Sequence, residues 1–292
     1  MKEMIIEILK IVAPLSVALI VFAQGLGIPL REVVRYFRER PRALLRALLA
    51  TLVLVPAAAL AIILALKPEP ALALGLAILV ACPPAPMMLK TAPAEGGASA
   101  AFMASLHLIL ASLAFVSVPC TLYLLTTALD SRANVNIGTM AWILARTILV
   151  PIAAGLTVRK LFRGFADRFA PLLDKMGTVG LFVVIVFAAA AFYPALLDMD
   201  LWGYLTIVAV SLAALAIGHW LGPSDAHEKT TLAVECGVRH PALAISIAAA
   251  RLTPEKAMPI LVPCVLTFIL MAMIYLLLRG RALRAAGSQA AR

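Results

Sequence analysis

The sequence has few charged residues and lacks the motifs that mark common catalytic sites. Charged residues make up 14% of the 292 positions and hydrophobic residues 63%, whereas a soluble domain is about a quarter charged and about half apolar. No Gly-x-Ser-x-Gly, His-Glu-x-x-His or phosphate-binding loop occurs, so hydrolysis, metal-dependent proteolysis and nucleotide chemistry have no support. The composition predicts a membrane protein that is not an enzyme.

Cysteine is also scarce, and its four positions form no framework. Their spacing is neither that of metal ligands nor that of disulfides in loops. Each lies within an apolar segment: Cys82, Cys120, Cys236 and Cys264. We therefore expect four small buried side chains, no metal site and no cofactor.

Acidic residues are fewer than basic ones, 15 against 25, which gives a net charge of +10. The main basic blocks, residues 31–42, 159–175 and 279–292, are short and lie between or after apolar segments, a placement that fits membrane loops rather than nucleic-acid binding. Lys and Arg collect on the cytoplasmic side of membranes. The blocks share one side if the N-terminus is outside and the C-terminus cytoplasmic, which predicts a multi-pass protein of the inner (plasma) membrane.

Apolar segments long enough to cross a bilayer recur along the whole chain. A transmembrane helix needs about 20 mostly apolar residues. The first segment is followed by basic residues and by no cleavage site, which favours a membrane span over a signal peptide. The sequence predicts an all-α membrane protein, a single unit over 1–292, with about nine transmembrane helices at 5–27, 43–66, 70–90, 98–128, 137–158, 174–196, 201–221, 228–250 and 256–278.

Two of these segments contain residues that interrupt helices. Pro83, Pro84 and Pro86 remove backbone donors from the third segment, and Gly237 and Pro241 flank a charged stretch in the eighth. Unwound backbone at membrane depth needs protein or water to satisfy it, which implies a polar cavity. The alternative is a pair of proline-kinked structural helices.

The two interruptions lie at matching places in two possible halves. Residues 1–128 form the first half, which lacks one helix, residues 137–278 form the second, and residues 279–292 form a basic cytoplasmic tail. Paired broken helices in corresponding positions are typical of the binding site of secondary transporters. We therefore predict an inverted-repeat secondary transporter.

Ionisable side chains coincide with the interruptions. A charge in mid-membrane costs at least about 2.5–3.5 kcal/mol. Glu235 and Arg239 can pair if the turn between them is helical, and Arg239 is otherwise a cation for the substrate. Lys90 either approaches the same region or extends to the cytoplasmic interface. His240 is either a group that titrates near neutral pH or a structural imidazole, and His107 is expected to hydrogen-bond to a neighbouring helix.

Three short stretches, at the start of the chain and at both interruptions, follow a known pattern. They read Phe-Ala-Gln-Gly-Leu at 22–26, Ala-Cys-Pro at 81–83 and Glu-Cys-Gly-Val-Arg-His at 235–240. They resemble, in this order, the F-x-x-G-L entry, the start of the C-P-G-G-T-A-S-N crossover and the E-x-G-x-Q-N crossover of the bile acid:sodium symporter family. The resemblance covers nearly the whole chain and implies a core domain with two crossing discontinuous helices and a panel domain that moves against it.

The same resemblance implies that most sodium ligands of the family are replaced. The family's Ser-Asn pair falls on Met87 and Met88, or one position later on Met88 and Leu89, and its Gln-Asn pair falls on Arg239 and His240. Hard cations prefer oxygen ligands. These positions therefore provide few oxygen ligands for a sodium ion, and the positive charge of Arg239 would repel it.

Two further family positions are replaced by Thr51 and Ala101, while Glu235 and a hydroxyl at Ser105 are retained. We therefore expect a transporter of a small organic anion that works by alternating access without sodium, either proton-coupled or facilitative. One alternative is a sodium-coupled symporter that uses Glu235, Ser105 and backbone carbonyls, and another is a membrane receptor or scaffold without transport. The expected partners are the substrate and the lipid bilayer, not nucleic acid, and the sequence indicates no oligomeric state.

Overall fold

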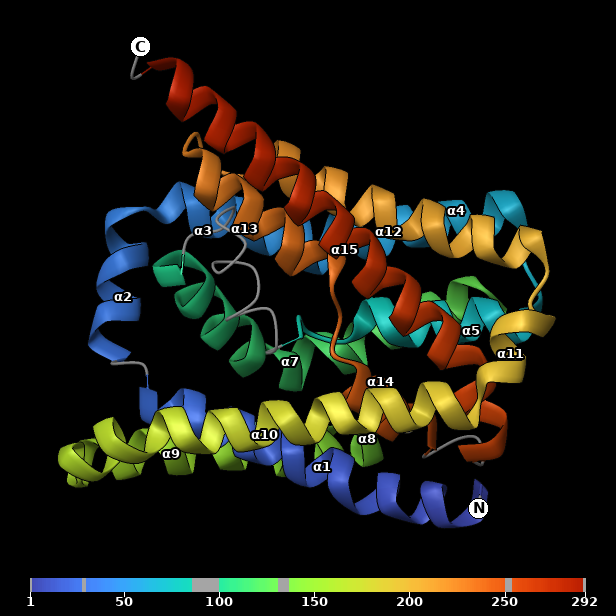
Figure 1. Ribbon diagram of the computed structural model, residues 1–292, viewed down its shortest axis with the longest axis horizontal. Helices are drawn as coiled ribbons and strands as arrows, with labels where there is room; N and C mark the ends of the chain where they lie inside the picture. Colours follow the sequence, from blue (N-terminus) through green and yellow to red (C-terminus); the bar gives the residue numbers. More distant parts are fainter. Residues whose placement is uncertain (1, 28–29, 86–99, 131–136, 250–253, 291–292) are drawn as a thin grey trace.

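Every regular element in the part of the chain that the structure describes is a helix. The computed structural model describes residues 2–27, 30–85, 100–130, 137–249 and 254–290. The helices are α1 (Lys2–Gly27), α2 (Leu30–Glu39), α3 (Pro41–Leu48), α4 (Val55–Leu66), α5 (Pro70–Ala81), α7 (Ala100–Ala128), α8 (Ile137–Leu144), α9 (Val150–Leu161), α10 (Arg163–Ala191), α11 (Tyr193–Asp198), α12 (Leu201–Leu221), α13 (Ala226–Gly237), α14 (Pro241–Ala249) and α15 (Pro254–Ala290), with π-helical turns η1 (Leu49–Leu54) and η2 (Ala145–Leu149) (Figure 1). The predicted all-α class is confirmed for these residues.

Six helical stretches are long and apolar enough to cross a bilayer. They are Pro41–Leu66, Phe102–Ala128, Met140–Leu161, Arg163–Ala191, Leu201–Leu221 and Lys256–Ala285, and Ile11–Gly27 and Pro70–Ala81 are shorter apolar helices. The predicted span 70–90 is helical as far as Ala81, and 228–250 is divided between α13 and α14. The chain is thus built for a membrane, while the number of nine spans and the inverted repeat stay predictions.

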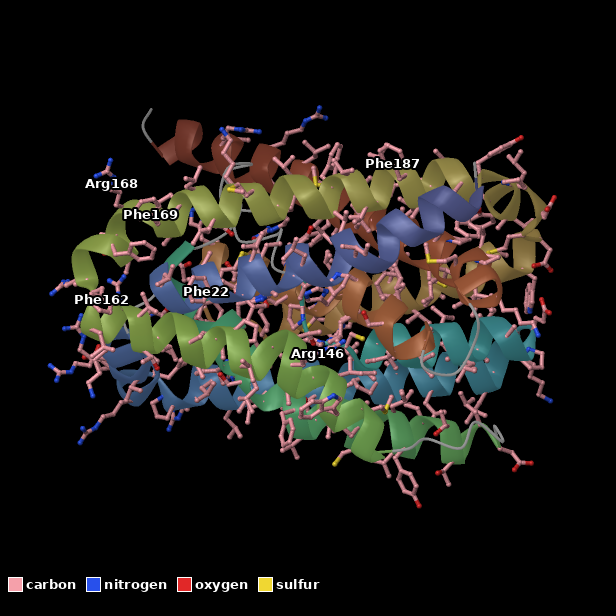
Figure 2. The ribbon with its side chains drawn as sticks, turned by 90° about the horizontal axis from the view of Figure 1, so that it is seen from below. Phe22, Arg146, Phe162, Arg168, Phe169 and Phe187 are labelled. Atoms are coloured by element: carbon pink, nitrogen blue, oxygen red, sulfur yellow. The ribbon has the colours of Figure 1, made fainter. Side chains whose placement is uncertain are left out.

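The long helices lie in two layers. The helices α1, α8–η2–α9 and α10 pack together as one layer, which we call the three-helix layer, and α3–η1–α4, α5, α7, α12, α13, α14 and α15 form the main layer (Figure 1). Helix α2 connects the layers at one end of the molecule and α11 connects them at the other (Figure 1). Figure 2, viewed from the side of the three-helix layer, shows Phe162, Arg168 and Phe169 at one end of this layer.

Glycines allow α1 to approach its neighbours closely within the three-helix layer. A Cβ atom on Gly25 would lie 2.6 Å from the carbonyl oxygen of Ile152 and 3.0 Å from the Cα of Gly155. A Cβ on Gly155 would in turn overlap the carbonyl oxygen of Phe22. Backbone meets backbone here, so only the absence of side chains permits this spacing, as in other small-residue contacts between membrane helices.

Each π-helical turn directly precedes a Val-Pro pair. Pro56 and Pro151 have no backbone N–H, and a proline ring clashes with the carbonyl one turn earlier in an α-helix, which a wider turn relieves. In η1, the N–H of Val55 donates to the carbonyl of Ala50. The same five-residue spacing would join the carbonyl of Thr51 to the N–H of residue 56, but Pro56 has no N–H, so this bond is missing. The Thr51 carbonyl is therefore free to accept a hydrogen bond from elsewhere.

Helix α2 and the residue after it are hydrogen-bonded to the first turn of α13. The Tyr36 hydroxyl and the Arg40 guanidinium both donate to the carboxylate of Glu228, and burial together with this carboxylate raises the pKa of Tyr36 well above its usual range. On the same side of α2, the Phe37 ring packs against the Phe102 ring of α7, with centroids 6.0 Å apart. These contacts join the segment between the two layers to the main layer.

The Glu228→Gln substitution is expected to loosen this attachment. The neutral amide would still accept from the two donors but more weakly, so the free energy of unfolding should fall by about 1 kcal/mol, the difference between hydrogen bonds to charged and to neutral groups. Thermal unfolding of the purified protein in detergent measures the change. Glu39→Gln, at an exposed position of α2, is the control. Equal midpoints for the two variants would contradict the assignment.

Three of the four cysteines are buried as expected, but Cys120 is exposed. It lies on the outward side of α7, where Val116 and Leu124 are also exposed. The prediction of a buried side chain was wrong at this position because an apolar membrane helix exposes apolar residues on its outer face as well. All four thiols are free.

Candidate ion and substrate site

The two interruptions predicted from the sequence meet in the structure. The Ala85 N–H donates to the Val238 carbonyl over 3.1 Å, and the His240 N–H donates to the Pro83 carbonyl over 2.9 Å. These bonds form an isolated antiparallel bridge between Pro84 and Arg239. Segments 157 residues apart thus satisfy each other's backbone, which is the condition for unwound chain in a membrane.

Local sequence explains both interruptions. Pro83 and Pro84 supply no backbone donor, so α5 ends at Ala81. Helix α13 ends at Gly237, and Pro241 begins α14, a position where its missing N–H would have no helical partner. The three residues between α13 and α14 are left extended for the bridge.

Glu235 is buried in the last turn of α13 and faces His107 of α7. Its side chain is 1% exposed, and its Oε2 lies 3.5 Å from Nδ1 of His107, which is 3% exposed. Neither carboxylate oxygen has a hydrogen-bond partner in the described part of the chain. The pairing with Arg239 required a helical turn from 235 to 239, and α13 ends before that turn is complete. His107 therefore occupies the place beside Glu235 that Arg239 would have taken if the turn were helical, and of the two alternatives for Arg239 the pairing with Glu235 loses its condition.

Arg239 is buried beside the bridge, with 3% of its surface exposed. Its guanidinium donates to the carbonyl of Cys82 over 3.3 Å and to the carbonyl of Thr51 over 3.5 Å. The second carbonyl is the one that Pro56 leaves free in η1. Both bonds are long, Nε has no partner, and no carboxylate of the described residues forms an ion pair with Arg239. A permanent positive charge is thus held in the main layer without a paired anion.

His240 has a structural role at the start of α14. Its Nδ1 accepts a hydrogen bond from the N–H of Leu243 over 3.3 Å, as an N-cap side chain does. Its Nε2 is buried and has no partner in the described ranges. One nitrogen thus orders the helix, and the other is turned to the interior.

The other predicted site residues are placed only in part. Thr51 is buried, and its hydroxyl donates to the carbonyl of Ala47 over 2.7 Å. Ser105 is buried on α7, two residues before His107. Four predicted residues lie outside the described residues: Pro86, Met87, Met88 and Lys90.

An apolar pocket lies between the layers and reaches the start of α14. It is lined by side chains of α10, α14 and α15, among them Leu181, Pro241 and Leu261. Pro241 follows directly after Arg239 and His240. An apolar surface at the junction of the layers therefore adjoins the charged interruption.

Two features were missed by the sequence analysis. His107 was assigned a general hydrogen bond and is the partner of Glu235; a lone histidine within an apolar segment was the available signal. Arg146, in η2 of the three-helix layer, is exposed within the apolar stretch Met140–Leu161 (Figure 2). It was visible as a single basic residue in an apolar segment.

Comparison with known proteins gives one family. The model described as the Sodium Bile acid symporter family matches residues 14–195, which is more than half of the chain and runs from α1 into α11. The matched range includes the first interruption and ends before the second. No curated protein matches the chain.

Proposed function

The chain belongs to the sodium bile acid symporter family, and from this premise we propose that this multi-pass membrane transporter carries a small organic anion without sodium. The coarse part of this statement, a membrane transport protein with a small-molecule substrate, follows from the family and from the apolar helices. The substrate class, the sodium independence and alternating access are our proposal.

The observation that carries the proposal is the charge of Arg239. A guanidinium is always protonated in proteins, and this one is buried where the two interruptions meet. A sodium ion beside it would be repelled. A fixed cation can hold the crossing segments together as it bonds to the carbonyls of Cys82 and Thr51, so no mobile cation is needed for that purpose. The same charge attracts an anionic substrate.

We further propose that the three-helix layer acts as a panel and the main layer as a core. The pocket between α10 and α14 supports a substrate position at their junction, next to His240 and Arg239. Helix α2 and helix α11 connect the layers (Figure 1), so they are the segments that would absorb a relative movement. In this proposal residues 1–128 and 137–278 are the two halves, the N-terminus is outside, and the basic tail is cytoplasmic.

The alternative of a sodium-coupled symporter is favoured by one observation. Both oxygens of Glu235 are buried without hydrogen-bond partners among the described residues, and a carboxylate in this state is a possible ligand for a hard cation. His107 lies 3.5 Å away and competes for that role, because a protonated imidazole would neutralise the carboxylate without sodium. The proposal keeps proton coupling or facilitated diffusion as the mode of transport.

Uptake into proteoliposomes tests the proposal directly. A panel of radiolabelled organic acids, from small carboxylates to a bile acid, would be offered in sodium, potassium and choline buffers. We expect at least one acid to accumulate at the same rate in all three, because Arg239 supplies the charge that sodium supplies elsewhere. A sodium-specific stimulation that is lost in Glu235→Ala, but kept in Glu39→Ala, would establish the symporter alternative. Specific binding with no uptake of any acid would favour a receptor.

A further inference from the structure

Arg239 borders a small pocket together with three hydroxyl-bearing residues. The pocket lies between η1, the end of α5 and α7, and its polar lining includes Arg239, Ser117 and Thr121. The rest of the lining is mostly apolar, with Pro56 and Leu110 among its residues. Thr51 also lines the pocket, but its hydroxyl donates to the carbonyl of Ala47. Arg239, Ser117 and Thr121 can donate hydrogen bonds into the space, and no acidic side chain of the described residues lines it.

The hydroxyls of Ser117 and Thr121 are not used within their own helix. Hydroxyls in apolar helices usually donate to the carbonyl four residues earlier, and here Ser112, Thr126 and Thr206 do so over 2.8–2.9 Å. Ser117 and Thr121 make no such bond, nor any other within the ranges that the structure describes. Their hydrogens are therefore available to a ligand in the pocket.

The positive charge of Arg239 is also not fully balanced by nearby negative groups of the described residues. The charge of Glu235 acts on Arg239, but its carboxylate faces His107. The two carbonyls that accept from Arg239 carry only partial charge and lie 3.3 and 3.5 Å away. A buried charge without a partner is strongly destabilising. Among the described residues, therefore, no negative charge balances Arg239 on the side of the pocket.

The space limits what can supply this charge. The centre of a water-sized sphere can move through about 10 Å³ of the pocket, which is close to the smallest volume that holds one water molecule. A monatomic ion or the end of a small carboxylate fits such a space with modest adjustment of its walls. A sulfate or a larger multivalent anion would require the helices to separate.

We infer that Arg239, Ser117 and Thr121 form a binding site for one small monovalent anionic group. Arg239 supplies the charge and the two hydroxyls of α7 donate hydrogen bonds. The group is either a free halide ion or the carboxylate of a small organic acid. The halide source is independent of the proposed function, whereas the carboxylate source rests on it, since the acid would then be the transported substrate.

Anion-dependent thermal unfolding of the purified full-length protein in detergent tests the site. Midpoints would be measured in potassium gluconate, potassium chloride and potassium formate at one ionic strength, because gluconate is too large for the pocket. Ligand present at about a hundred times its dissociation constant should raise the midpoint by several degrees, roughly 5–10 °C. A rise in chloride identifies a halide site, and a rise in formate alone identifies a carboxylate site.

Variants assign the effect to these residues. We expect the anion-dependent rise to disappear in Arg239→Gln and to shrink in the double variant Ser117→Ala, Thr121→Val, which retains the arginine and serves if Arg239→Gln does not fold. Thr126→Val is the matched control on α7, because its hydroxyl bonds within its own helix. Equal midpoints in all three salts, or a rise retained in both site variants, would overturn the inference and leave water as the occupant.

The same samples separate this site from the proposed transport. If chloride raises the midpoint but no acid is transported, the anion site is supported and the proposed function is contradicted. If an acid is transported but no anion raises the midpoint, the proposed function is supported and the anion site is contradicted.

Discussion

The Gly155→Ala variant is expected to fold poorly or not at all. Its new Cβ would overlap the carbonyl oxygen of Phe22 and lie 2.9 Å from the Cα of Gly25. Both atoms belong to the backbone of α1 and cannot rotate away, so α1 and α9 would have to separate. Overpacking usually costs about 1–3 kcal/mol, and we expect at least the upper end here because no side chain can adjust. The yield of monodisperse protein and its thermal midpoint in detergent measure the effect.

Gly164→Ala is the matched control for this experiment. Gly164 lies in the first turn of α10, and a Cβ there would meet nothing within 4 Å. Alanine has the higher helix propensity, so this variant should be as stable as the wild type or slightly more stable. If Gly155→Ala also unfolded at the wild-type midpoint, the close approach of α1 and α9 would not exist as described.

The His107→Leu variant is expected to lose about 1–3 kcal/mol of stability, because it removes the imidazole that lies beside the buried carboxylate of Glu235. His107 and Glu235 are 3% and 1% exposed and 3.5 Å apart, so water does not replace the lost contact readily. Leucine fills much of the volume of the imidazole, which keeps the packing cost small. Thermal unfolding in detergent gives the change, with the exposed His227→Leu as the control.

A second substitution distinguishes a lost partner from a packing defect. Adding Glu235→Gln to His107→Leu removes the unpartnered charge, so the double variant should be more stable than His107→Leu alone. Interaction energies between residues in contact reach about 0.5–3 kcal/mol. Additive losses would show that His107 and Glu235 do not depend on each other, and the pairing would have to be abandoned.

Much of the fold was readable from the sequence because membrane helices are specified by local composition. Apolar stretches of sufficient length predicted the helices, and Pro83, Pro84, Gly237 and Pro241 predicted where helices end. The site was readable only as a set of residues. Which charged groups pair depends on the path of the chain after α13, and a helical continuation and an extended one are both compatible with the sequence from 235 to 239.

The exposure of Cys120 and Arg146 was also not predictable from the sequence. Apolar residues on both faces of a membrane helix give no clear amphipathic pattern, so the sequence does not distinguish inward from outward positions. Burial of Cys82 and exposure of Cys120 follow from which neighbours cover each helix, and that is a property of the assembled layers.

Residue composition and order were enough to predict an all-helical membrane protein, two interrupted helical segments, and ionisable groups at one interruption. These features depend on hydropathy and on proline and glycine, whose effects act within a few residues. The folded arrangement was needed to show that the interruptions pair through the backbone and that His107 faces Glu235. It also decided that Arg239 bonds to the carbonyl that Pro56 leaves free at Thr51. The reason is geometric: each contact joins residues far apart in the chain, and the packing of the helices fixes which of them meet.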